Sequence, residues 1–340
     1  NPGRRYALIQ RAVLPELADS IASLDCDGIF LRSHIVRYYP HRDFMCHVLG
    51  FVNYEGHGCY GVEQGMNRFL HGTPGILVSK KDALQKELYW ERERVIPSIE
   101  GSDVHLTIDQ YVQHIAEEAI EQAMIEHRAR GAWAIVQRVA TGEILALASR
   151  PAFDLNQFRT AEDEAKLNRA VGVIFEPGSI MKAMTFAAVF NERLVTPETV
   201  LDCENGAWMY GGRLLRDYRP YGTLTVADGF KKSSNILTAK LALLLGNENL
   251  YAYMRNFGFG NRLGFDLPGE EGGILHATKT WSKISATRIA IGQGVAVTAI
   301  QMLAAYNAIA NDGILMRPYV IAHVEKKEGT LLHYRGPEVV

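Results

Sequence analysis

Residues 175–190 read FEPGSIMKAMTFAAVF and encode a turn followed by an apolar, Ala-rich helix. Pro177 and Gly178 favour the turn, and Ser179 and Lys182 follow, three positions apart. Residues at i and i+3 share one face of a helix, so a hydroxyl and an amine can meet there. A serine with its own base is one way to build a nucleophile, so the stretch makes the chain a candidate acyl-transfer enzyme.

A second polar cluster, Ser233-Ser234-Asn235, stands where another apolar helix is predicted, at residues 234–245. Ser and Asn are common N-cap residues, so either cluster alone is compatible with ordinary helix capping. Two such clusters in one chain favour a shared site. Lys182 can act as a base only if its amine is neutral, which requires burial or a nearby cation to lower its pKa.

The bulk composition is that of an ordinary globular protein. The chain has 340 residues, 47% hydrophobic and 22% charged, which is enough for two domains with a sizeable core. Its formal net charge of −2 gives no reason to expect nucleic-acid binding. No apolar run approaches the roughly 20 residues that cross a bilayer. Because the chain begins at Asn1 rather than Met, we expect a segment upstream of it.

The cysteines form no CxxC pair. A disulfide between Cys46 and Cys59 is compatible with an oxidising compartment, but their spacing does not require it. Residues 41–59 also mix metal-ligand types, yet the spacing matches no standard zinc pattern, so we expect no metal there. The ligand types in that segment are His41, Cys46, His47, His57 and Cys59, and the other two cysteines are Cys26 and Cys203.

Two domains are predicted. Residues 1–100 are rich in Gly, His and Tyr, and we expect strands and short helices joined by loops. Residues 95–102 read as a linker, and residues 101–340 form the second domain. In this second domain the order of predicted elements favours a sheet with helices packed on it, an α+β fold.

Several elements of the second domain are predicted in detail. Asp109 is expected to cap a helix that Gly131 ends. Residues 196–225 are expected to be loop-rich. The apolar face of the capped helix is predicted to carry Val112, Ile115, Ala116, Ala119, Ile120 and Ala123. The other expected elements are a strand at 106–108, a hairpin at 134–148, a helix from the capping box at 298–301 to 311, and a hairpin at 318–334.

At these motifs the chain resembles the penicillin-binding proteins. Residues 176–182, EPGSIMK, are similar to the family's first motif, and Ser233-Ser234-Asn235 to its second. Phe175-Glu176-Pro177 and the short linker look closer to the septal, division type than to the elongation type. The first domain resembles the non-catalytic, dimerisation-type pedestal of class B members at Arg37-Tyr38-Tyr39-Pro40, His47-Val48-Leu49-Gly50 and Gly61-Val62-Glu63.

The resemblance implies a transpeptidase domain like that of penicillin-binding proteins and serine β-lactamases, acting in septal peptidoglycan synthesis. Ser179 would attack the penultimate D-Ala carbonyl of a stem peptide, with Lys182 as its base. Ser233 would relay a proton to the leaving amine, and Asn235 would bind the substrate amide. An amine from a neighbouring peptidoglycan strand would attack the acyl-enzyme and form a crosslink. β-Lactams would acylate the same serine.

The resemblance also implies partners and a location. No cofactor or metal is needed, because the Ser–Lys pair supplies both nucleophile and base. The expected partners are peptidoglycan stem peptides, β-lactams and membrane proteins of the division complex. The expected location is the extracytoplasmic, periplasmic face of the cell membrane, reached through an N-terminal helix upstream of Asn1.

The family's third motif, Lys-Thr-Gly or Lys-Ser-Gly, has no counterpart in the sequence. Lys279-Thr280-Trp281 is the nearest match, but it has Trp in place of Gly and precedes Gly292-Gln293-Gly294, so we expect it to be unrelated. The chain is therefore expected to be truncated before that motif, and we do not expect normal activity from this piece alone. Two alternatives stay open, namely a β-lactamase or β-lactam sensor and a catalytically silent division scaffold.

Overall fold

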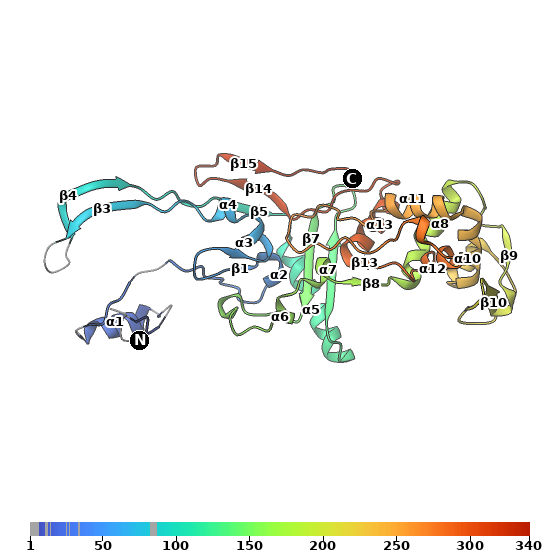
Figure 1. Cartoon of the computed structure of the whole chain (residues 1–340), viewed down its shortest axis with the longest axis horizontal. Coiled ribbons are helices and arrows are strands. Elements are labelled where there is room, and N and C mark those ends of the chain that lie inside the picture. The colour runs from blue at the N-terminus through green and yellow to red at the C-terminus, as the bar shows by residue number, and fades with distance from the viewer. Residues whose placement is uncertain are drawn as a thin grey trace.

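Three regions succeed one another along the long axis of the molecule (Figure 1). The structure is a computed structural model, and it describes residues 7–10, 13, 15–24, 26, 28–32, 35–81 and 87–340. In those residues, no helix combines the length and the apolar character needed to cross a bilayer.

The first region holds short helices and two small hairpins, as the sequence predicts for residues 1–100. One hairpin, formed by β3 and β4, extends away from the rest of the molecule (Figure 1). The four cysteines are free, and Cys46 is buried. The elements are α1 (Pro15–Ser23), α2 (Cys46–Leu49), β1 (Phe51–Val52), β2 (Gly58–Cys59), α3 (Gly61–Gly65), α4 (Asn67–Leu70), β3 (Ile76–Lys81) and β4 (Glu87–Ile96).

The second region is built from a three-stranded sheet and a hairpin with a helix against it. The sheet has the order β15-β14-β5, and β6 pairs with β7. Hydrogen bonds from Thr107 Oγ1 to Ile144 O (2.7 Å) and from Ile144 N to Tyr319 O (2.9 Å) join the two. The elements are β5 (Asp103–Leu106), α5 (Gln110–His127), β6 (Ala132–Gln137), β7 (Ile144–Arg150), β14 (Ile321–Glu325) and β15 (Leu331–Tyr334).

The predicted hairpins and the Asp109 cap are confirmed, but three details of this region were wrong. The strand expected at 106–108 lies at 103–106. Helix α5 ends at His127 because Arg128 takes the left-handed conformation (φ 50°), so Gly131 plays no part in its ending. The predicted apolar face is also only partly buried, because Ile115 is 65% exposed and Ala119 is exposed as well.

Polar side chains take the buried places on α5 instead. Gln113 Nε2 donates to Leu147 O (3.1 Å), and Gln113 Oε1 accepts from Leu147 N (2.7 Å). Glu117 forms an ion pair with Arg150. Helix α5 is therefore fixed to β7 by hydrogen bonds at positions that a hydrophobic pattern cannot reveal.

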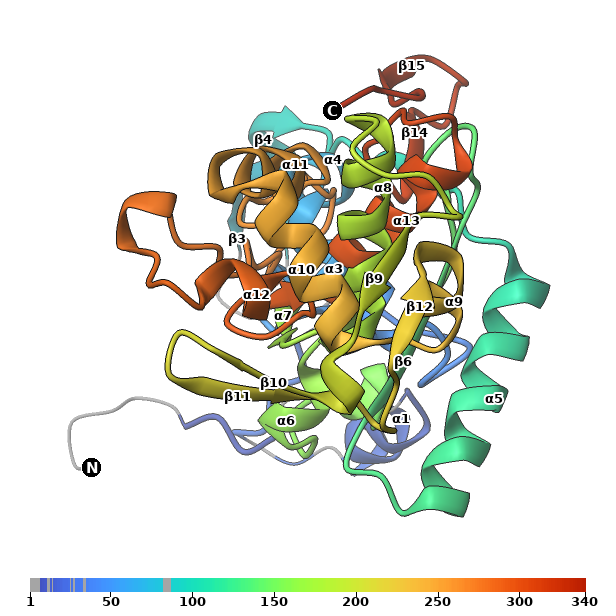
Figure 2. The ribbon, with the colours of Figure 1, turned by 90° about the vertical axis from the view of Figure 1, so that its right-hand side faces the viewer.

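The third region is a helical lobe at the other end of the molecule. Helix α10 packs against α8, α11 and α12 (Figure 2), around a core that includes Met184, Ile236, Leu241 and Met254. The elements are η2 (Gly178–Met181), α8 (Lys182–Asn191), β9 (Val200–Asp202), η3 (Glu204–Gly206), β10 (Ala207–Tyr210), β11 (Arg213–Arg216), β12 (Thr223–Thr225), α9 (Val226–Lys231), α10 (Asn235–Leu245), α11 (Asn247–Asn256), η4 (Thr278–Thr280), α12 (Ser285–Ile289) and α13 (Ala299–Ala310). Elements that join this lobe to the middle region are η1 (Leu155–Gln157), α6 (Asp163–Lys166), α7 (Arg169–Gly172), β8 (Ile174–Phe175) and β13 (Val297–Thr298).

The loop-rich prediction for residues 196–225 was wrong. Strands β10 and β11 form a hairpin, and β12 pairs with β9. Gly211 and Gly212, both at positive φ, occupy the two-residue turn between β10 and β11. A Gly-Gly pair is a known signal for such a turn, and it was overlooked in the sequence.

Candidate functional site

Ser179 lies exposed in the short 3₁₀ turn η2, directly before helix α8. The helix predicted to begin at Ser179 thus starts as a 3₁₀ turn and becomes α-helical at Lys182. The turn is held by two hydrogen bonds from a neighbouring loop. Gly178 N donates to Gly292 O (3.0 Å), and Gly294 N donates to the Glu176 carboxylate (2.7 Å). A third comes from α13, where Tyr306 Oη donates to Ile180 O (2.9 Å).

The approach of residue 292 to the Ser179 turn requires glycine. Gly292 has φ +77°, a conformation that L side chains rarely adopt. A Cβ at that position would lie 2.2 Å from Gly178 O, which is backbone and cannot move aside cheaply. Gly292 therefore lets two chain segments touch, and this contact fixes where the serine stands.

Lys182 is the first residue of α8, and its side chain is only 2% exposed. Its Nζ donates to Ser233 O (2.6 Å) and to Ser233 Oγ (2.9 Å). In the described part of the chain, no carboxylate lies within ion-pair distance of this amine. Burial lowers the pKa of Lys182 to about 8, against a raising effect from the Asp217 carboxylate. A buried amine with oxygen partners but no paired carboxylate is thus more readily neutral than an ordinary lysine.

Ser233 sits in the left-handed region (φ 54°) between α9 and α10, where it is exposed. Such a conformation is costly for a residue with a Cβ, by about 1–3 kcal/mol. Ser234 follows as the N-cap of α10 and accepts from Leu237 N (3.0 Å). The kink at Ser233 lets the chain turn so that this residue reaches Lys182 while its neighbour caps the helix.

Asp217 anchors the start of α10, and no feature of the sequence marked it. Its carboxylate accepts from Ser234 Oγ (2.8 Å), Asn235 N (2.5 Å) and Ile236 N (3.0 Å). Asn235 Nδ2 donates to Arg216 O (2.8 Å), so the end of β11 also orients the Asn235 amide. Asp217 precedes the N-cap residue Ser234 by 17 positions, in a stretch predicted to be loop, and its role appears only in the fold.

The structure thus places Lys182 against Ser233. Lys182 follows Ser179 by one turn of the chain, and Ser233 precedes Asn235 by two residues. Both described hydrogen bonds of Lys182 Nζ go to Ser233, and none goes to Ser179 Oγ. Lys279-Thr280 lies in the 3₁₀ turn η4 rather than on a strand, as expected for an unrelated sequence match.

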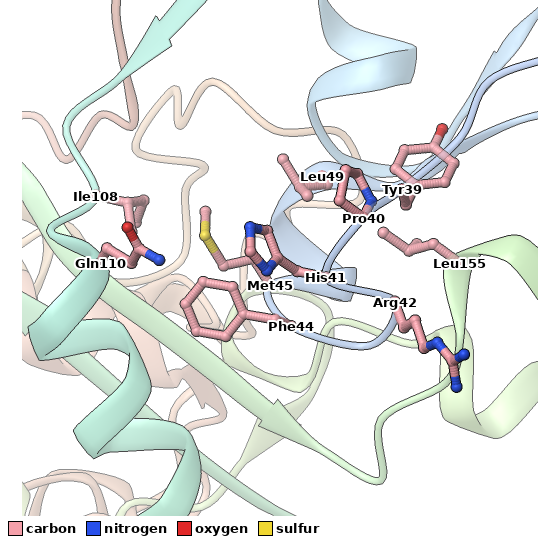
Figure 3. Close-up of a pocket in the computed structure, with 10 residues that line it drawn as sticks. All are labelled: Tyr39, Pro40, His41, Arg42, Phe44, Met45, Leu49, Ile108, Gln110 and Leu155. Carbon is pink, nitrogen blue, oxygen red and sulfur yellow. The ribbon is translucent and has the colours of Figure 1, made fainter.

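A separate pocket lies on other elements (Figure 3). It has a volume of about 250 Å³ and is lined mainly by residues 39–49, with Ile108, Gln110 and Leu155. The side chains of His41, Phe44 and Met45 gather in it. None of its lining residues belongs to the Ser179 turn or to the start of α10, so this pocket is not the site predicted from the sequence.

Two of the metal-ligand types of residues 41–59 are in environments that oppose metal binding. His47 Nε2 bonds the Ala165 carbonyl (2.7 Å). Burial raises the pKa of the Cys46 thiol to about 12, so the thiolate that binds metals is disfavoured. In the described residues, the one group whose ligand atoms converge is elsewhere, at His105, His323 and Glu325.

The sequence matches a known protein family. Residues 132–339 match the family model described as the penicillin binding protein transpeptidase domain. The chain belongs to this family. The fold class implied by the sequence resemblance is confirmed, whereas the domain boundary near residue 100 and the pedestal role of the first region stay predictions.

Relatives and solved structures agree with this assignment. Penicillin-binding protein PbpB of Mycolicibacterium smegmatis is 31% identical over 336 residues, covering 98% of this chain and 52% of the relative. Peptidoglycan D,D-transpeptidase FtsI of Escherichia coli K12 is 31% identical over 331 residues, covering 96% and 54%. The crystal structure of penicillin binding protein 3 from Mycobacterium tuberculosis matches with a TM-score of 0.79 and 32% identity, over 90% of this chain and 65% of that one. The chain spans about half the length of the curated relatives it matches.

Proposed function

We propose that the protein is a serine-type peptidoglycan D,D-transpeptidase, with Ser179 as nucleophile and Lys182 as its general base. The observation that carries this proposal is the buried amine of Lys182, bonded to Ser233 and one turn from an exposed serine. Relatives named as peptidoglycan D,D-transpeptidases supply the substrate class. The names of these relatives indicate the reaction, whereas the roles of Ser179 and Lys182 are proposed from the environment of these side chains in this chain.

The first step forms an acyl-enzyme. Ser179 Oγ attacks the carbonyl of the penultimate D-Ala, and Lys182 Nζ accepts the hydroxyl proton. The C–N bond to the terminal D-Ala then breaks, and that amine leaves with a proton relayed through Ser233. Hydrogen bonds between catalytic groups often tighten only when substrate is bound, so the missing bond between Ser179 and Lys182 does not oppose this assignment.

The second step resolves the acyl-enzyme by transfer to an amine. The amine of a neighbouring stem peptide attacks the ester carbonyl and forms the new C–N bond. The ester C–O bond breaks, and the amine proton passes through the Lys182–Ser233 pair to Ser179 Oγ, which regenerates the serine. The Ser179 backbone N–H lies in the first turn of a helical segment, where helix geometry leaves donors without an internal acceptor. Such a donor stabilises the oxyanion, and loss of one typically costs about 3–4 kcal/mol of barrier.

Asn235 supplies recognition of the substrate backbone. Its Nδ2 is already held by Arg216 O, and its backbone N–H by Asp217. A side-chain amide that is already hydrogen-bonded, on a backbone that is itself fixed, loses little rotamer entropy when it binds a peptide. Asn235 is therefore a binding residue rather than a member of the proton path.

β-Lactams are the second class of ligand that we propose for Ser179. Penicillin binding protein 3 of Mycobacterium tuberculosis is described in complexes with aztreonam and with ampicillin. A β-lactam would open on Ser179 Oγ to give an ester, with the ring nitrogen receiving the proton. We place the protein in septal wall synthesis at the extracytoplasmic face of the cell membrane, together with other division proteins, because relatives include FtsI and stage V sporulation protein D.

The reaction itself tests the proposal. The full-length protein is mixed with a synthetic stem peptide ending in D-Ala-D-Ala and with an amine acceptor, and released D-Ala and the joined product are measured. We expect both with the native protein and neither with Ser179→Ala. Product from Ser179→Ala, or no D-Ala release by a folded native protein, would contradict it. Rapid turnover of penicillin without any joined product would favour a β-lactamase.

A further inference from the structure

Three side chains that can bind a metal meet on the sheet formed by β15, β14 and β5. They are His105 on β5 and His323 and Glu325 on β14, and their ligand atoms all lie within 4.8 Å of one another. The His105 and His323 rings stack with centroids 4.1 Å apart and planes 11° apart. His105 Nε2 lies 3.0 Å from Glu325 Oε1. This convergence of two imidazoles and a carboxylate has no part in the serine chemistry.

Strand register brings the three together. His105 and His323 are direct partners across the antiparallel pair, so their side chains share one face. A register shift between Ile321 and His323 makes Ala322 an extra residue on β14. Bulges of this kind redirect side chains, and this one places His323 rather than Ala322 opposite His105. Glu325 lies two residues farther on and hence on the same face.

The charges around the cluster favour a cation. Asp103 is the strand partner of Glu325 and adds a second carboxylate to that face. The two lysines that follow Glu325 are paired with other carboxylates, Lys326 with Glu328 and Lys327 with Glu100. Two imidazolium rings stacked at this spacing repel each other, whereas two neutral rings can share one cation. The side chains of His105 and Glu325 are 46% and 33% exposed, so an ion can enter and waters can complete its coordination.

We propose that His105, His323 and Glu325 bind a divalent transition-metal ion of the zinc class. Two imidazole nitrogens and one carboxylate oxygen suit Zn²⁺, Co²⁺ or Ni²⁺ and do not suit Mg²⁺ or Ca²⁺, which prefer oxygen ligands alone. Tetrahedral bonds of about 2.0–2.1 Å put ligand atoms about 3.3 Å apart. The ligand atoms therefore need to close by no more than about 1.5 Å, which rotation of these partly exposed side chains can supply.

The ion would act as a clamp between distant parts of the chain. His105 and Glu325 are 220 positions apart in sequence. β5 leads directly into α5, and β14 belongs to the hairpin that follows α13, so a shared ion ties both to one sheet. The site lies near the middle of the molecule, whereas Ser179 belongs to the helical lobe at one end (Figure 1). The role we assign is thus structural.

Metal titration of the full-length protein tests the site. Co²⁺ binding is followed by its visible absorption and Zn²⁺ binding by calorimetry, each in a Cys26→Ser background that removes an exposed thiol. The test variants are His105→Ala, His323→Ala and Glu325→Gln. His333→Ala is the matched control, because His333 stands on the neighbouring strand but pairs with buried Val324 and stacks on Phe69.

We expect one equivalent of Zn²⁺ or Co²⁺ per chain, and a rise in thermal midpoint with Zn²⁺ but not with Mg²⁺. His105→Ala and His323→Ala should weaken binding by at least about 10-fold and remove the thermal shift. His333→Ala should bind as the Cys26→Ser protein does. The proposal is overturned if that protein shows no saturable binding below millimolar Zn²⁺, or if His333→Ala weakens binding as much as His105→Ala.

Discussion

Burial changes what the amine of Lys182 can do. With a pKa of about 8, the Lys182 amine is neutral in roughly a tenth of the molecules at pH 7. The neutral fraction of an ordinary lysine at that pH is about one part in 3,000. The protonated amine opposes folding, because its pKa in the folded state lies below the unfolded value. That unfavourable contribution is complete below pH 8 and disappears as the pH rises toward 10.5. Burial of Lys182 thus lowers the stability of the folded protein below pH 8, but it provides an amine that can act as a base.

The pH dependence of acylation should follow Lys182. The rate constant for labelling by a fluorescent penicillin should rise tenfold per pH unit below pH 8 and level off above it, so that pH 6 is about 100-fold below the plateau. Lys182→Arg should lose labelling, because a guanidinium stays protonated. A flat profile between pH 6 and 9, or a labelled arginine variant, would exclude Lys182 as the base.

Asp217 is expected to matter for both stability and chemistry. Asp217→Ala removes three hydrogen bonds at the start of α10 and should lower the free energy of unfolding by about 2–3 kcal/mol. Labelling should slow by at least about 10-fold, because Asn235 and Ser234, the neighbour of Ser233, lose their anchor. The pKa of Lys182 should also fall further, since the Asp217 carboxylate raises it, so the pH midpoint of labelling should move to lower pH.

The matched control is Asp228→Ala in the adjacent helix α9, whose carboxylate has no described partner. It should change stability by less than about 0.5 kcal/mol and leave the pH midpoint unmoved. If Asp217→Ala lowers stability but keeps the native pH midpoint, then Asp217 supports the helix without acting on Lys182. At this scale the sequence predicted Ser179, Lys182, Ser233 and Asn235, and missed Asp217 because its partners lie 17 to 19 positions away.

At the scale of elements, the contact between the Ser179 turn and Gly292 makes a sharp prediction. Gly292→Ala should lower the free energy of unfolding by 2 kcal/mol or more and largely abolish penicillin labelling, because Cβ would strike Gly178 backbone atoms. Gly294→Ala is the matched control. It has a similar φ of +69° but nothing within 4 Å, so only backbone strain of about 1 kcal/mol is expected and labelling should persist. Equal losses in both variants would show that conformation, and not the contact, explains the effect.

Local signals predicted the elements whose ends are capped by side chains. Asp109 caps α5, Ser234 caps α10, and the capping box of Thr298 and Gln301 is present at α13. The misses had tertiary causes. Arg128 takes a left-handed conformation three residues before the glycine that seemed the natural end of α5, and Gln113 and Glu117 are buried only because β7 offers them partners.

At the scale of the whole molecule, α13 connects the separate cores. Ile300 packs in the core beside the sheet, and Met302 and Ala305 pack in the core of the helical lobe. One rigid helix thus links the sheet to the lobe that carries Ser179. Fold class and helix α13 itself could be predicted from the sequence, but the position of α13 between two cores could not, because periodicity does not say which core a face meets.

The linkage predicts cooperative unfolding of both cores. Ile300→Ala should lower the free energy of unfolding by about 2–4 kcal/mol, and the sheet and the helical lobe should unfold together. The measurement follows Trp133 near the sheet and Trp208 in the lobe, in variants that keep one tryptophan each. Ile309→Ala, on the same helix but 43% exposed, should cost less than about 1 kcal/mol. Separate transitions for the two tryptophans would show that the lobes are independent.

The most direct measurement is to locate the β-lactam adduct by mass spectrometry after digestion of the penicillin-treated, full-length protein. We predict one penicilloyl group, on Ser179, and no such group in Lys182→Arg under the same treatment. An adduct on another residue, or an unmodified Ser179 in a folded protein exposed to excess penicillin, would contradict it.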